Sequence, residues 1–179
     1  MISAQIVVRG LVFGKISNNV CALIFTFNSM GIDKDIQQEN FRSIYQKLSI
    51  NLIFSTNWIT EKIKNILQEE DITPQQYNIL RILRGSKKPL STLQIRERML
   101  DKMSDTSRIV ERLVKKELVE KKTSNIDKRL VDVSIAESGL ELLKRLDQKN
   151  EELDAILQNL SPEEAAGLSD LLDKMREKI

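Results

Sequence analysis

The sequence is poor in the residues that bind metals and activate nucleophiles. Its 179 residues include one cysteine, Cys21, and no histidine. A single cysteine cannot form a disulfide within the chain, which is typical of a reducing compartment such as the cytoplasm. Zinc sites rely on cysteine and histidine, and serine and cysteine nucleophiles commonly need a histidine base. The sequence also has no glycine-rich phosphate loop, so we expect no metal, no cofactor and no enzymatic activity.

Proline, glycine and aromatic residues are scarce as well. The chain has three prolines, six glycines and 4% aromatic residues, against 41% hydrophobic and 30% charged residues. This balance is typical of a globular, helix-rich protein. The apolar run from Val20 to Phe27 is too short to span a bilayer. We therefore expect a mainly helical, cytoplasmic protein that does not enter a membrane.

Residues 1–29 differ in composition from the rest of the chain. They contain two basic residues and no acidic residue. We expect Met30 to be the natural start and residues 1–29 to be an extension outside the fold, with a short docking strand as the alternative. Residues 30–179 are then expected to form a single domain, the usual organisation at this length.

A long helix is predicted from Asp33 to Glu69, a stretch without proline or glycine. Its apolar residues recur at helical spacing and form a broad stripe. A stripe of this width has to pack on other elements, and half of it could pack on a second chain. The residues of this stripe are Ile36, Ile44, Leu48, Leu52, Trp58, Ile59, Ile63, Ile66 and Leu67.

Three capping boxes predict where later helices begin. Each has a serine or threonine followed three residues later by glutamine or glutamate, and these pairs start at Thr73, Ser91 and Ser161. In such a box each residue satisfies the free backbone N–H of the other. Proline occupies the first helical position after Thr73 and after Ser161, where it is favoured.

The segment from Met103 to Glu117 predicts a helix with two different sides. Met103, Thr106, Val110 and Leu113 fall on one side, which can be buried. The other side carries Ser104, Arg108, Glu111 and Lys115, flanked by Ser107 and Arg112. Arginine and serine side chains suit the base edges of the DNA major groove. An ordinary solvated face is the alternative for an isolated helix of this kind.

The surroundings of this helix favour the DNA-binding interpretation. A short amphipathic helix is predicted just upstream, from Leu90 to Leu100, which gives a helix-turn-helix. Two strands are predicted downstream, Leu118–Thr123 and Arg129–Ile135, on either side of a tip at residues 124–128. The expected fold is therefore mainly α with a small β wing: a winged helix-turn-helix plus a helical dimerisation bundle.

The run from Thr73 to about Leu143 resembles the MarR family of bacterial transcriptional regulators. The resemblance lies in ITPQQYNILRIL, LSTLQIRERML, SDTSRIVERLVKKELVEK and the wing DKRLVDVSIAESG. Two positions depart from the family pattern. Glu117 stands where glycine is usual, and a side chain disfavours a left-handed helix end. Ala136 stands where threonine is usual, which removes a capping hydroxyl worth about 1 kcal/mol.

The resemblance, together with the two-sided helix, gives a set of expected sites. The wing pair Asp127 and Arg129 is expected in the minor groove. A small organic effector would bind between the dimerisation helices and the DNA-binding region, with Trp58 and Tyr77 as candidate walls and core packing as their alternative role. The full set expected to contact DNA is Ser91, Ser104, Asp105, Thr106, Ser107, Arg108, Arg112, Lys115, Asp127, Lys128 and Arg129.

Charge and leucine patterns complete the expectation. Residues 102–130 hold nine Lys and Arg against five Asp and Glu, a balance of +4. Residues 131–179 hold six against twelve, a balance of −6. Helices predicted at 137–157 and 161–179 have no expected partner in the winged region. We therefore expect residues 33–70 and 137–179 to form a homodimer interface, and residues 72–136 to bind DNA.

The sequence thus predicts a dimeric, sequence-specific transcriptional regulator that binds a pseudo-palindromic site on double-stranded DNA and responds to a ligand. The alternative is a winged-helix module that binds protein or RNA through the same face. DNA binding would depend steeply on salt concentration, and this would separate the two.

Overall fold

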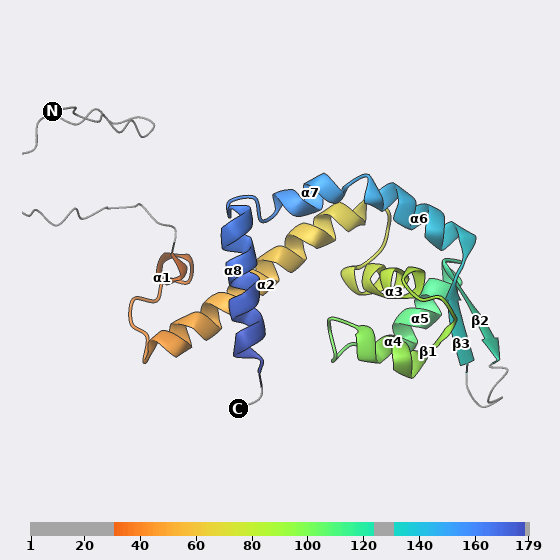
Figure 1. The fold of residues 1–179 in the computed structure, drawn as a ribbon, viewed down its shortest axis with the longest axis horizontal. Helices are drawn as coiled ribbons and strands as arrows, with labels where there is room; N and C mark the ends of the chain where they lie inside the picture. Colours follow the sequence, from red (N-terminus) through yellow and green to blue (C-terminus); the bar gives the residue numbers. More distant parts are fainter. Residues whose placement is uncertain (1–30, 124–130, 178–179) are drawn as a thin grey trace, which may run out of the picture. The chain divides into compact units, whose positions relative to one another are not determined.

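The computed structural model describes residues 31–123 and 131–177 (Figure 1). The chain divides into two compact units, Met1–Arg42 and Ser43–Ile179. The first unit contains α1 (Ile32–Asp35). The expected extension at residues 1–29 lies outside the described residues. The wing tip, with Asp127, Lys128 and Arg129, also lies outside them.

The prediction of one helix from Asp33 to Glu69 is wrong at its N-terminal end. The long helix is α2 (Ile44–Gln68), and it begins only after Ser43. The Ser43 hydroxyl accepts a hydrogen bond from the backbone N–H of Gln46 at 3.2 Å, which caps the helix. Gln37 has a left-handed backbone with φ of 54°, which ends the short helix upstream. Residues 36–43 therefore do not extend the apolar stripe of α2.

The three capping boxes are confirmed, and they start α3 (Pro74–Arg84), α4 (Thr92–Arg98) and α8 (Pro162–Met175). At the first of them, the Thr73 hydroxyl accepts from the Gln76 N–H at 3.2 Å. The Gln76 side chain accepts from the Thr73 N–H at 2.9 Å. Local sequence alone therefore determines these three boundaries.

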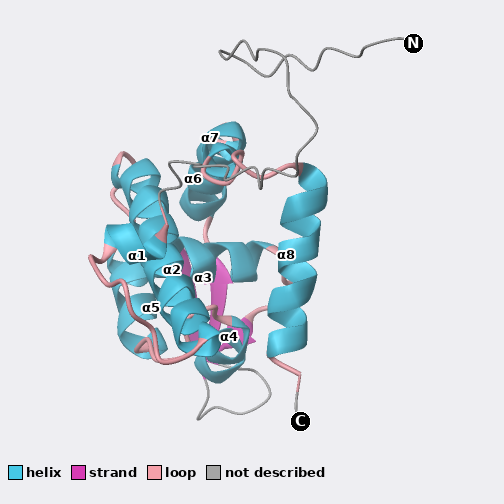
Figure 2. Ribbon diagram, turned by 90° about the vertical axis from the view of Figure 1, so that its left-hand side faces the viewer, coloured by secondary structure: helices cyan, strands magenta, loops and turns pink. Residues whose placement is uncertain are grey.

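The wing is part of a three-stranded antiparallel sheet with the order β1-β3-β2. The two expected strands are confirmed as β2 (Val119–Thr123) and β3 (Val131–Ile135). A third strand, β1 (Leu90–Ser91), was expected to be helical and instead pairs with β3. Leu90 lies opposite Val133, and both side chains are fully buried. Figure 2 shows how small this sheet is beside the helices, which confirms the expected fold class.

The helix expected from Met103 to Glu117 is α5 (Thr106–Lys115). Asp105 caps it, so Met103 precedes the helix, and its side chain is 93% exposed rather than buried. Glu117 adopts the left-handed conformation that its side chain disfavours, with φ of 58°. This conformation costs a non-glycine residue about 1–2 kcal/mol. The N–H of Leu118 then bonds to the carbonyl of Leu113 at 3.0 Å, which closes the helix end.

The helix expected at residues 137–157 is divided into α6 (Glu137–Asp147) and α7 (Asn150–Ala155). The expectation that it has no partner in the winged region is wrong for α6, because Leu142, Leu143 and Leu146 are part of the buried core. Gly139 allows this packing, since a Cβ there would lie 2.3 Å from the Leu118 carbonyl oxygen. As expected, the Ala136 side chain provides no cap.

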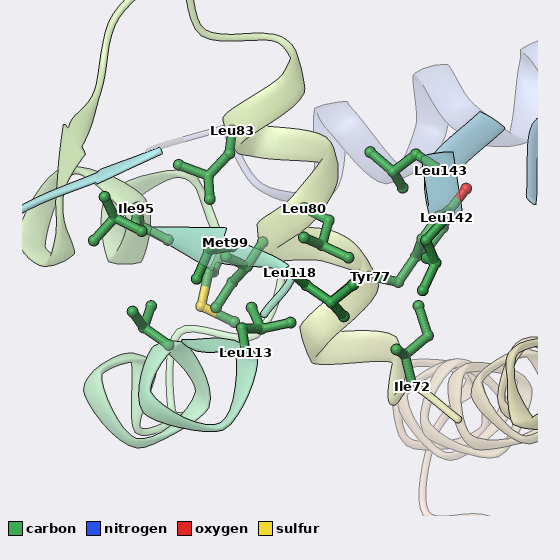
Figure 3. Packing of buried hydrophobic residues seen from close by; sticks show 14 of the residues in the cluster. Ile72, Tyr77, Leu80, Leu83, Ile95, Met99, Leu113, Leu118, Leu142 and Leu143 are labelled. Atoms are coloured by element: carbon green, nitrogen blue, oxygen red, sulfur yellow. The ribbon is translucent and has the colours of Figure 1, made fainter. Parts of the chain in front are cut away.

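One apolar core unites α3, α4, α5, α6 and the sheet, which together we call the reading head. Figure 3 shows leucine side chains from α3, α5 and α6 pointing toward one another, with Met99 and Ile95 on the α4 side. Leu80, Ile95, Val110, Leu113 and Leu143 are fully buried. The burial of each such side chain contributes about 1.5–3 kcal/mol. The reading head therefore holds α5 rigidly.

The apolar side chains of α2 and α8 remain largely exposed. On α2, Leu67 alone among the described residues of the helix is fully buried. None of the helices in residues 31–123 and 131–177 is long and apolar enough to cross a membrane. The exposed large apolar residues of this pair of helices, which we call the bare stripe, are Ile44, Tyr45, Leu48, Ile53, Phe54, Trp58, Leu168, Leu171 and Met175.

Candidate nucleic-acid interface

The outer face of α5 carries the candidate interface. Val110 and Leu113 are fully buried on the inner side of the helix, as expected. Ser107, Arg108, Glu111, Arg112 and Lys115 are exposed on the other sides. A helix anchored on one side and presenting cations and a hydroxyl on the other has the form that a major groove accepts.

Three of the expected contact residues are engaged at the start of α5. Thr106 is only 4% exposed, and its hydroxyl donates to the Met99 sulfur at 3.2 Å. Its expected place among the DNA contacts is therefore wrong. The Asp105 carboxylate accepts from the Arg108 N–H at 3.1 Å, which caps the helix. The Ser104 hydroxyl donates to Asp101, and this bond is the main cause that lowers the pKa of the Asp101 carboxyl.

One carboxylate stands on the outer face among the cations. Glu111 forms an ion pair with Lys121, which comes from β2. The pair neutralises the acid and links α5 to the wing strand. Arg108, Arg112 and Lys115 then leave this face net positive, as binding to a phosphate backbone requires.

The remaining expected contacts lie outside α5. Ser91 is half-buried, and its hydroxyl accepts from the Gln94 N–H at 3.3 Å at the start of α4. An N-capping role therefore explains this serine without DNA. Asp127, Lys128 and Arg129 lie outside the described residues, so their roles stay predictions.

A cavity of about 590 Å³ lies between α2, the start of α3 and the end of α5. Its walls include four cationic residues and one carboxylate: Lys64, Arg112, Lys115, Lys116 and Asp71. Sequence reasoning missed it because the cations come from separate segments. The signal that could have found it is the cluster of basic residues at 112, 115 and 116.

The two residues expected to wall an effector site do not line this cavity. Trp58 is 39% exposed on α2, where the Lys62 ammonium lies 5.9 Å from its ring centroid. Tyr77 is 9% exposed in the core, and the Arg81 guanidinium lies 5.7 Å from its ring. Tyr77 therefore has the alternative role given above, packing in the core, rather than lining an effector site.

Comparison with known proteins finds a family match for part of the chain. Residues 70–130 match the model of the MarR family. Among curated proteins, no sequence matches the chain significantly. The matched stretch contains α3, α4, α5 and β2, so the candidate interface lies within the residues that match the family model.

Several solved structures share the fold. A MarR transcription factor from Planctomyces limnophilus is 28% identical with a TM-score of 0.58, over 75% of this chain and 98% of that one. A mutant MarR from E. coli complexed with operator DNA is 22% identical with a TM-score of 0.70, over 78% and 100%. BpsR from Bordetella bronchiseptica, whose DNA binding is regulated by 6-hydroxynicotinic acid, is 18% identical with a TM-score of 0.69, over 78% and 100%. The chain thus has the fold of the MarR-family transcription regulators.

Proposed function

We propose that this protein is a dimeric, sequence-specific DNA-binding transcriptional regulator. The observation that carries the proposal is the outer face of α5. Arg108, Arg112 and Lys115 are exposed on a helix whose opposite side is locked into the core. In this proposal α5 enters the major groove, where Arg108 reads base edges near the start of the helix. The wing, with Arg129 oriented by Asp127, enters the adjacent minor groove.

The bare stripe supports the dimeric part of the proposal. Large apolar patches on an isolated chain mark interaction surfaces. A two-fold dimer covers the same patch on both copies at once. It would also place two α5 helices on one face of the duplex, about 34 Å apart, the distance between successive major grooves.

The cationic cavity supports control by a small organic acid. Lys64, Arg112 and Lys115 line it, and the last two also lie on α5. A carboxylate bound there would compete with phosphate for the same cations. The BpsR structure provides an example of a related fold regulated by such an acid. Control requires that the ligand bind unequally to DNA-competent and DNA-incompetent arrangements.

A salt titration of Arg108→Ala on selected DNA tests the proposal. Genomic fragments that bind the full chain are first recovered to define the site. Loss of Arg108 should cost about 1–3 kcal/mol on that site and relax the preference at one base position. Lys144→Ala, which removes an exposed cation of α6, provides the matched control and should leave affinity unchanged. Binding that is independent of salt, or equal effects of the two variants, would favour a protein- or RNA-binding module instead.

A further inference from the structure

The turn that follows α2 contains three ion pairs in three consecutive residues. Glu69, Glu70 and Asp71, which we call the acidic turn, each meet a cation from another segment. Lys149 pairs with Glu69, Arg145 of α6 with Glu70, and Lys116 with Asp71. Three consecutive carboxylates are thus held by the end of α5, by α6 and by the residue before α7.

We propose that the acidic turn is an electrostatic clamp that fixes the angle between α2 and α5, with Lys116 as the positioning residue. The proposal rests on the proposed function, because this angle would set the spacing of two α5 helices on DNA. Lys116 caps the C-terminus of α5, so it connects the candidate reading helix directly to α2.

The geometry at Lys116 is specific. Its ammonium contacts the Asp71 carboxylate at 2.6 Å and also donates to the Asp71 backbone carbonyl. Asp71 has a left-handed backbone with φ of 51°, and Glu117, next to Lys116, has φ of 58°. Non-glycine residues adopt this conformation rarely, although aspartate tolerates it better than most. The clamp therefore joins the segments that follow α2 and α5, each of which contains a left-handed residue.

The Glu70 pair is the best formed of the three. Arg145 donates to both oxygens of Glu70 through Nε and Nη2, at 3.2, 3.2 and 2.8 Å. The Glu70 side chain is only 19% exposed. A fork of this kind restricts orientation as well as distance. It holds the acidic turn on α6, and Lys116 then holds α5 on the acidic turn.

Because α2 is long, a small change of its angle at the clamp moves its far end by a large distance. A helix of 25 residues, as α2 is, is about 37 Å long. A rotation of about 10° at the acidic turn would therefore move the far end of α2 by about 6 Å. Leu67 and Ile72 are buried in the same apolar core as the reading head, and Ile63 packs against it, so apolar contacts attach the end of α2 while the ion pairs set its angle. Exposed ion pairs add little stability, but they can decide between poses of nearly equal energy.

The test measures the angle without DNA. Nitroxide labels are placed on Asn51→Cys in α2 and Arg98→Cys in α4 of the full chain with Cys21→Ser, diluted with unlabelled chain so that only distances within one copy contribute. The parent should give a narrow distance distribution. Lys116→Met should raise the population of other poses by up to about fivefold and broaden the distribution. Asp71→Asn, which keeps a residue tolerant of φ above zero, should broaden it similarly, whereas Lys116→Arg should restore the narrow distribution.

Lys144→Met controls for the loss of a lysine on the reading head. A distribution unchanged by Lys116→Met, or broadened equally by Lys144→Met, overturns the clamp. A second arm compares affinities for selected DNA with half-sites at their natural spacing and moved by one base pair. Lys116→Met should discriminate less between the two than the parent does, and equal discrimination would overturn the positioning role. If the parent does not bind DNA, the proposed function fails, while the distance measurement still decides whether the clamp exists.

Discussion

Leucine and isoleucine side chains are buried in the reading head and exposed on the bare stripe. In the reading head, Leu113 and Ile95 are fully buried. On α2 and α8, Ile44 is 71% exposed and Leu171 is 64% exposed. The residue types are the same, and the hydrophobic effect acts on both in proportion to the apolar area. The reading head thus buries its apolar residues within one chain, whereas those of α2 and α8 stay exposed, as the proposed dimer would require.

The largest expected effect comes from opening the core of the reading head. Leu113→Ala should lower the free energy of unfolding by about 2–5 kcal/mol, because it removes buried methyl groups and leaves a cavity. The measurement is urea unfolding followed by circular dichroism. Leu168→Ala on α8 is measured at the same protein concentration for comparison. Its effect on the free energy of unfolding depends on whether a second copy covers Leu168. If Leu113→Ala unfolds at the parent's midpoint, the description of the core is wrong.

The next prediction concerns Leu171 of the bare stripe and its neighbour Leu172. Replacing Leu171 and Leu172 by glutamate should yield monomers or insoluble protein, because four charges would enter the shared surface of a dimer. Sedimentation velocity measures the outcome. Gln158→Glu, an exposed position before α8, should leave the association state unchanged. An unchanged dimer in the double variant would mean that the interface lies elsewhere.

A smaller effect is expected at the start of α6, within the reading head. Ala136→Ser should raise the free energy of unfolding by about 1 kcal/mol, because it supplies the missing cap of α6. Thermal unfolding of parent and variant provides the measurement. Ala136→Val, which adds no hydroxyl group, should not raise the free energy of unfolding. Equal melting temperatures for parent and Ala136→Ser would show that another group already satisfies the helix start.

The smallest effect is the acid sensitivity of the acidic turn. The hydrogen bond from Arg145 lowers the pKa of the Glu70 carboxyl from its ordinary value of 4.5. A carboxyl with a lowered pKa stabilises the fold when ionised, fully above its ordinary pKa, and this stabilisation is lost as the pH falls through the lowered value. Glu70→Gln should therefore flatten the decline of the melting temperature below about pH 5. Glu151→Gln, on α7, should show the same dependence of melting temperature on pH as the parent. The prediction is contradicted if the parent, Glu70→Gln and Glu151→Gln all show the same dependence.

Sequence reasoning predicted what is locally encoded. The boxes at Thr73, Ser91 and Ser161 begin helices where expected because their partners lie three residues away. The periodic pattern of α5 correctly separated Val110 and Leu113 from Arg108. Helix periodicity failed at residues 33–43, where the Ser43 cap and the left-handed Gln37 override a continuous stripe.

Features that depend on distant residues were missed. Leu90 is a strand residue because β3 lies beside it, and neither segment encodes this alone. Thr106 was counted among the DNA contacts although the helical pattern placed it on the buried side, and the structure buries it against Met99. The cationic cavity and the acidic turn combine three or more segments each, so they become visible only once the chain is folded.

The central claim is that two copies of the chain place two α5 helices on one DNA duplex. Hydroxyl-radical footprinting on a recovered genomic fragment, with the bound mass measured by analytical ultracentrifugation, tests it most directly. The account predicts two chains per duplex and two protected windows on one face, centred about 10 base pairs apart. One chain per duplex, or a single protected window, would contradict it.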